Sequence, residues 1–156
     1  MHITIVAVGQ KLPAWAQTAV DDYLARFPRD FTAIVKEVKA EARTGGKPVA
    51  QVMAAEAERI ERAVPAGDIL VAMDEHGRDM TTVDFAKKIS GWKNEGYGVT
   101  FIIGGADGLD PALKAKARMM LRLSSMTLPH AFARVLLTEQ IYRAWSILAN
   151  HPYHRV

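Results

Sequence analysis

The sequence predicts one α/β domain, a mostly parallel sheet with helices on both faces. Two observations predict this fold class. Strand-like and helical hydrophobic patterns alternate about five times along the chain. No linker, repeat or low-complexity segment interrupts them, and 156 residues suffice for one ordinary domain with a real core. We therefore treat residues 1–156 as a single domain.

The composition limits the possible functions. Hydrophobic residues make up 49% and charged residues 24%, a normal globular balance. The absence of cysteine excludes disulfides, thiolate catalysis and cysteine-based zinc sites. The sequence contains no run of 18 apolar residues, the length needed to span a membrane. The opening MHITIVAVG is too short and too quickly polar for a signal peptide, so we expect a cytoplasmic protein. A net charge of +3 and a pI near 9.3 permit an RNA partner without indicating one.

The first quarter of the chain alternates strand, helix, strand and loop. Residues 2–8 form a β-branched run closed by a glycine. A proline then stands where a helix would begin, and residues 14–27 have helical apolar spacing. Residues 31–38 are predicted as the second strand, and the polar residues 41–47, with two glycines, as a mobile loop.

The middle of the chain repeats the pattern. Residues 49–64 place an apolar stripe on a helix whose other face is charged. Residues 68–73 are continuously apolar, as expected for a strand covered on both faces. Thr81 or Thr82 caps a predicted helix that runs to Asn94, with Gly96 beyond its end.

The last third adds two more strand and helix pairs. We predict strands at residues 99–103 and 121–124, and helices at residues 111–119 and 132–150. The last helix is apolar on more than one side, which indicates contact with its own sheet and with a second subunit.

Three strand ends are candidates for a ligand site, because ligands of open parallel sheets bind beyond the carboxyl ends of the strands. They are MDEHG (73–77), GGADG (104–108) and SSMTLP (124–129). GGADG is neither the dinucleotide fingerprint nor a P-loop. It is equally compatible with a tight turn followed by a helix entry, in which Asp110 is the cap and Pro111 the first helical residue.

A histidine metal site is disfavoured. His151 and His154 are three residues apart and His130 follows a proline, but Pro152 breaks helical geometry between the first two and no acidic residue stands beside them. We expect no metal.

Three segments resemble one known family over essentially the whole chain. They are VAVGQKLPAW (6–15) with YLARFPRD (23–30), FIIGGADGL (101–109), and LSSMTLPHAFARVLLTEQIYRAWSILANHPYHR (123–155). The chain resembles the RlmH (YbeA) family of SPOUT-class methyltransferases, which modify N3 of a pseudouridine in large-subunit ribosomal RNA.

The resemblance implies a carboxyl-terminal trefoil knot, a homodimer with its pocket close to the subunit interface, and S-adenosyl-methionine as methyl donor. It also implies that the ribosomal RNA substrate is recognised within the ribosome. By the same resemblance, the cofactor-binding residues are Met73, Gly104, Leu123, Ser124, Ser125, Met126, Thr127 and Leu128.

The chemistry needs a group that accepts the N3 proton or stabilises the developing anion. The resemblance makes His154 and Arg155, which we expect near the pocket, the candidate catalytic residues, with Arg134 and Arg143 as further anion stabilisers. Arg143 could equally be a structural partner of Glu139 one turn away.

The substrate also needs phosphate contacts, and two basic clusters are candidates. They are Lys114, Lys116, Arg118 and Arg122, and Lys36, Lys39, Arg43 and Lys47. Two other classes stay open from the residues: a non-enzymatic nucleotide-binding or ribosome-associated factor, and an NAD-type oxidoreductase, which the missing fingerprint disfavours.

Overall fold

The sheet is entirely parallel among the residues that the structure, a computed structural model, describes (1–9 and 11–155). Its strands are β1 (His2–Val8), β2 (Thr32–Val38), β3 (Ile69–Arg78), β4 (Val99–Ile103) and β5 (Met119–Leu121). They lie in the order β2-β1-β4-β3-β5, and every neighbouring pair is parallel. This arrangement confirms the predicted α/β fold class.

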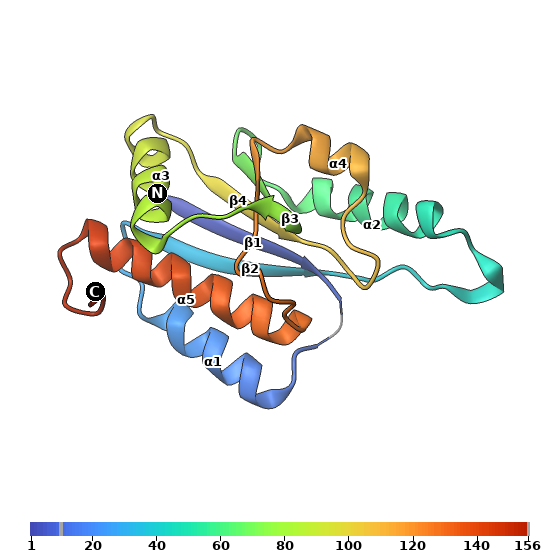
Figure 1. The fold of residues 1–156 in the computed structure, drawn as a ribbon, viewed down its shortest axis with the longest axis horizontal. Helices are drawn as coiled ribbons and strands as arrows, with labels where there is room; N and C mark the ends of the chain where they lie inside the picture. The colour runs from blue at the N-terminus through green and yellow to red at the C-terminus, as the bar shows by residue number, and fades with distance from the viewer. Residues whose placement is uncertain (10, 156) are drawn as a thin grey trace.

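Helices cover both faces of the sheet (Figure 1). They are α1 (Ala14–Ala25), α2 (Val49–Ala63), α3 (Thr82–Asn94), α4 (Pro111–Lys116) and α5 (His130–Leu148), with a short 3₁₀ turn, η1, at Thr44–Gly46. Helices α1, α3 and α5 pack on one face, and α2 and α4 on the other. Within the described residues no helix is both long and apolar enough to cross a membrane.

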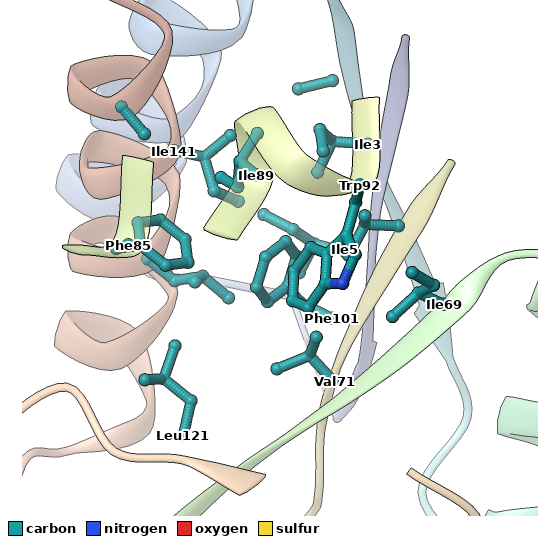
Figure 2. Close-up of a cluster of buried hydrophobic side chains, with 14 of the residues drawn as sticks. Ile3, Ile5, Ile69, Val71, Phe85, Ile89, Trp92, Phe101, Leu121 and Ile141 are labelled. Carbon is teal, nitrogen blue, oxygen red and sulfur yellow. The ribbon is translucent and has the colours of Figure 1, made fainter. Parts of the chain in front are cut away.

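The core has two layers because alternate strand residues point to opposite faces. On one side, Ile3, Ile5 and Phe101 pack against Phe85 and other apolar residues of α3 and α5, as Figure 2 shows. On the other side, Val6, Val8 and Ile102 pack against α2 and α4. The sheet is therefore buried on both faces, which fixes where its strand-end loops emerge.

Local signals in the sequence placed several helix ends correctly. The Thr81 side chain accepts a hydrogen bond from the Asp84 main chain at 3.1 Å, and Gly96 follows α3 with φ of 85°. Asp110 caps α4 through the Ala112 main chain at 2.7 Å, with Pro111 as the first helical residue. These caps confirm the predicted helix entries.

Other boundaries were wrong. The fifth strand occupies Met119–Leu121 instead of residues 121–124, and α4 ends at Lys116 instead of 119. Met119 lies opposite Val71, and Leu121 opposite Met73. Pairing with the edge of β3 thus draws apolar residues out of the predicted helix, an example of tertiary context overriding local pattern. Helix α5 also begins two residues earlier and ends two residues earlier than the predicted range.

The third strand is longer than predicted and irregular. It continues past Met73 to Arg78, and both of these residues pair with Leu121. Residues 74–77 therefore leave the ladder and return to it. Gly77 permits the return, because a Cβ at this position would lie 2.7 Å from the main chain of Leu121. The carboxyl-terminal trefoil knot stays a prediction.

Candidate functional site

The irregular second half of β3 and the loop that follows β5 line a pocket of about 170 Å³ at the carboxyl ends of the strands. We call it the strand-end pocket. Its lining comes from β3 and its excursion, from the ends of β4 and β5, from the loop after β5, and from the first turn of α5. These residues are Met73, Asp74, Glu75, Ile103, Leu121, Arg122, Leu123, Ser124, Met126, Thr127, Leu128 and Ala133.

The structure brings most of the predicted cofactor-binding residues together in this pocket. Those that line it are Met73, Leu123, Ser124, Met126, Thr127 and Leu128. Gly104 and Ser125 are not among the lining residues, although Ile103, next to Gly104, is. Gly104 lies against its own loop, because a Cβ there would be 2.5 Å from the carbonyl carbon of Gly108.

The GGADG segment forms the tight turn that was one of its two interpretations. The Gly108 main chain donates to the Gly105 carbonyl at 3.0 Å, and Gly108 has φ of 82°. Asp107 pairs with Arg43. The turn closes before α4 begins, so only its first part adjoins the strand-end pocket.

The main chain of the loop after β5 is available for hydrogen bonding. Among the described residues, the N–H groups of 123–128 make a single hydrogen bond, from Met126 to the hydroxyl of Ser124 at 2.9 Å. Main-chain groups that the protein leaves unpaired next to a pocket are available to a ligand. This loop can therefore read the hydrogen-bonding edge of a flat heterocycle.

Sequence reasoning missed several lining residues. Leu121, Arg122 and Ala133 were not predicted, since the fifth strand was placed too late and α5 was expected to begin at 132. Arg122 pairs with Asp79, with both nitrogen–oxygen distances at 2.6 Å. The pairing of β5 with β3 determines where the loop after β5 begins, and the local sequence pattern carries no information about this pairing.

Asp74 supplies a negative charge at the pocket rim. Burial alone would raise the pKa of Asp74, but hydrogen bonds from the His76 main chain and from Lys114 lower it below its ordinary value. The carboxylate is therefore ionised at neutral pH and suits a cationic or hydroxyl-bearing ligand.

The carboxyl-terminal tail is tied to the second half of α5. Arg143 pairs with Glu139, as its position one turn away predicted, and Tyr153 donates to the same carboxylate at 3.0 Å. The Tyr153 hydroxyl also lies 3.0 Å from that of Tyr23. Burial, then these hydrogen bonds, raise the pKa of Tyr153 well above its ordinary value, so the phenol stays protonated.

The two predicted catalytic residues are not at the pocket of their own chain. His154 contacts Arg143, whereas the pocket touches α5 at Ala133. The two positions are ten residues apart, about 15 Å along the helix axis. Figure 1 shows the carboxyl terminus at the far end of α5 from the loop that enters it. Within one chain, the expected closeness of tail and pocket is absent, because α5 is continuous and carries the chain away.

The predicted basic clusters are mostly neutralised. Five of their members pair with carboxylates: Lys114 with Asp74, Lys116 with Glu61, Arg122 with Asp79, Arg43 with Asp107 and Lys47 with Glu41. Lys36 donates to the Ala63 carbonyl. In the part of the chain that the structure describes, Lys39 and Arg118 are the only members whose side chains form neither an ion pair nor a hydrogen bond. A role for either cluster in RNA binding stays a prediction.

A search of the described residues finds no group of three or more histidine, aspartate and glutamate side chains that could hold a metal ion.

Comparison with known proteins gives concordant matches. The model of a family described as "Predicted SPOUT methyltransferase" matches residues 1–154. A protein of Ralstonia pickettii named "Ribosomal RNA large subunit methyltransferase H" is 54% identical over 156 residues, covering 100% of both chains. A protein of the same name from Bordetella avium is 54% identical over 155 residues, covering 99% of each.

Two solved structures share the fold. A probable methylase family protein from Haemophilus influenzae superposes with a TM-score of 0.59 at 14% identity, covering 99% of this chain and 70% of that one. A putative methylase family protein from Neisseria gonorrhoeae gives 0.53 at 14% identity, covering 99% and 95%. At such low identity, these two likenesses concern the fold alone.

Proposed function

This chain belongs to the SPOUT methyltransferase family, and from that premise we propose that it transfers a methyl group from S-adenosyl-methionine to N3 of a pseudouridine in large-subunit ribosomal RNA. Full-length relatives at 54% identity carry the name of a large-subunit ribosomal RNA methyltransferase. Because its substrate is ribosomal RNA, the enzyme acts on ribosomes, and therefore in the cytoplasm. The N3 position follows from the resemblance to the RlmH family.

The observation that carries the proposal is the strand-end pocket. Six residues expected to contact the cofactor line it, among them Met73 and Leu128. The main chain of residues 123–128, unpaired except at the Met126 N–H, fits an adenine edge, and the ionised Asp74 fits a cationic or hydroxyl-bearing part of the same molecule. When bound, S-adenosyl-methionine supplies a methyl group that is already activated on a sulfonium. The protein's main task is therefore to align the reactants and to manage one proton.

The tail residues have defined hydrogen-bonding roles. An arginine can only donate, so the 3.2 Å contact from Arg143 Nη1 requires His154 Nδ1 to accept. The proton of a neutral His154 then lies on Nε2, which is buried without a partner among the described residues. In this tautomer His154 is a donor that cannot take the N3 proton, so that proton leaves to solvent water, and exposed Arg155 is suited to the negative charge that develops on the uracil.

A homodimer would bring the tail to a pocket. The tail lies far from the pocket of its own chain, so a catalytic tail has to serve the pocket of a second copy. The surface of α1 and α5 supports this arrangement. Trp15 and Phe132 are 50% and 49% exposed, and their rings pack in a tilted arrangement with centroids 4.8 Å apart. Exposed aromatic residues of this kind are typical anchors of interfaces.

The test uses purified protein, S-adenosyl-methionine and ribosomes from cells that lack the modification. Calorimetry measures cofactor binding, and mass spectrometry of the large-subunit RNA locates the added methyl group. We expect micromolar or tighter binding and one methyl group on N3 of a pseudouridine. A methyl group on another base, or on the ribose, would refute the N3 assignment while leaving the methyltransferase activity in place.

A further inference from the structure

A second hollow lies at the same edge of the sheet, beside the strand-end pocket. The loops after β1 and β2, the GGADG turn and the start of α5 enclose it, and it consists of two adjoining parts that share Gly9, Lys11 and Ala40. We call it the β1–β2 cleft. Strand β4 stands between the two hollows: Ile103 lines the pocket and Gly105 lines the cleft. The cleft therefore opens next to the strand-end pocket, at the carboxyl ends of the strands.

A buried arginine fixes the state of a histidine in this cleft. Arg134 is 1% exposed, and its Nη2 lies 3.0 Å from Nε2 of His130, which lines the cleft. Because the guanidinium can only donate, Nε2 of His130 must be the acceptor. The imidazole is thus neutral with its proton on Nδ1, and no described residue accepts that proton.

Positive charge is concentrated around the cleft. Lys11 and Lys39 line it, both exposed and neither in an ion pair with a described residue. The Nε of Arg134 has no hydrogen-bond partner among the described residues, although it is buried. Glu37 also lines the cleft, with its carboxylate partly exposed and 3.6 Å from Arg134 Nη1, and the buried carboxylate of Glu56 lies against Gly105, another lining residue.

The amino terminus of α5 adds to the positive electrostatic potential of the cleft. Pro129 offers no side-chain cap, so the first N–H groups of the 19-residue helix are left without a cap from the described side chains. The amino terminus of a helix attracts anions. Here it adjoins two unpaired lysines, a buried arginine and a histidine held as an N–H donor.

We propose that the β1–β2 cleft binds a phosphate group of the substrate RNA, through Lys11, Lys39 and the Nδ1–H of His130. The inference rests on the proposed function, since the neighbouring pocket supplies the reason that the anion is an RNA phosphate. Buried Arg134 acts as a positioning residue that keeps His130 in the donor tautomer. Glu37 holds that arginine from the side of β2.

The experiment measures methylation of unmodified ribosomes at several salt concentrations, with Lys11→Gln, Lys39→Gln and the control Lys93→Gln. Lys93 is an exposed, unpaired lysine in the last turn of α3, at the opposite edge of the sheet. For each cleft variant we expect a raised KM for ribosomes with little change in kcat. The slope of log(kcat/KM) against log[salt] should become shallower by about one unit. Calorimetric affinity for S-adenosyl-methionine should stay unchanged throughout.

His130 provides a second arm. His130→Asn keeps an N–H group near the position of Nδ1, whereas His130→Leu removes it. We expect His130→Asn to retain most of the ribosome affinity and His130→Leu to lose about tenfold, with thermal unfolding recorded for both. The proposal is overturned if the wild type methylates ribosomes and both lysine variants match Lys93→Gln in KM and in salt slope. If the wild type binds no S-adenosyl-methionine, the proposed function fails instead.

Discussion

Nη1 of Arg143 lies 3.2 Å from Nδ1 of His154, and the same guanidinium stands over the ring of Tyr153 at 4.8 Å. One side chain of α5 thus holds two residues of the carboxyl-terminal tail. Arg143 is itself fixed by Glu139. The tail packs on α5 and, through Tyr153, on Tyr23 of α1, and it adds no strand to the sheet, so removal of its last residues separates chemistry from folding.

Removing residues 154–156 should leave folding and cofactor binding intact but slow methylation. The core contacts of α5 do not involve His154 or Arg155. We expect a decrease in turnover of two or more orders of magnitude, about 3 kcal/mol of barrier, with nearly unchanged affinity for S-adenosyl-methionine. Single-turnover methylation and calorimetry measure the two effects. Wild-type turnover in the truncated protein would show that the tail is a solvated end.

Mixed dimers should reveal whether the tail serves the partner's pocket. We combine the truncated chain with a chain whose pocket is blocked by Ala133→Leu. At a concentration of S-adenosyl-methionine too low to fill the blocked pocket, each homodimer should be nearly inactive, whereas the mixed dimer contains one open pocket facing one intact tail. Recovery of about half of the wild-type rate per mixed dimer is expected on this geometry. No recovery in a verified mixed dimer would show that the tail does not act at the pocket of the partner chain.

Charging the exposed aromatic pair should dissociate the dimer. Phe132→Glu places a carboxylate where the rings of Trp15 and Phe132 pack together. We expect association to weaken by about 2 kcal/mol or more, roughly thirtyfold in Kd. Sedimentation velocity across a dilution series measures it. The matched control is Ile34→Glu, since Ile34 is also 50% exposed but lies on β2 outside the α1 and α5 surface. Equal dissociation in both variants would contradict an interface through α5.

Filling the strand-end pocket should weaken cofactor binding without unfolding the chain. Ala133 lines the pocket from the first turns of α5, so Ala133→Leu should lower the affinity for S-adenosyl-methionine at least about tenfold, a cost within the usual range for overpacking. Ala115→Leu, an exposed site on α4, is the control. Calorimetry measures affinity and thermal unfolding measures stability.

Gly104 is a less selective probe of the same pocket. A side chain there would meet the main chain of Gly108 at 2.5 Å, so Gly104→Val should lower Tm as well as cofactor affinity. A Gly104→Val protein with wild-type Tm and wild-type affinity would remove Gly104 from the site altogether.

The parts of the fold that the sequence predicted correctly are those with local causes. The cap at Thr81 and the Asp110–Pro111 entry depend on neighbours in the chain, and both were located from residue type alone. The β-branched run of β1 was placed with its observed bounds. In these segments, propensity and tertiary structure agree.

The parts that were missed depend on distant partners. Met119 becomes a strand residue because Val71 lies beside it, almost fifty positions earlier. The burial of Arg134 and its contact with Glu37 of β2 have no local signature either. The same holds for the separation of tail and pocket, which depends on the path of α5. Residue types identified the candidate groups, but only the packed structure shows which of them meet.

His130 should make stability depend on pH near neutrality. Burial, and then the guanidinium of Arg134, lower the pKa of His130, against the opposing effect of Glu37 from β2. Lys11, from the loop after β1, lines the same cleft and adds to the positive field. The folded protein therefore takes up a proton on this ring less readily than the unfolded chain does, whose histidine titrates near pH 6.5.

The sign of the effect follows from proton linkage. As the pH falls through about 6.5, the unfolded chain gains a proton on residue 130 that the folded chain does not, so the free energy of unfolding decreases until the folded pKa is reached. His130→Asn has no such group. The stability difference between the wild type and His130→Asn should therefore shrink as the pH is lowered from about 8 to about 5. Urea unfolding at several pH values measures both curves, and the remaining histidines cancel in the difference. A difference that stays constant, or grows on acidification, would show that Arg134 does not hold His130 neutral.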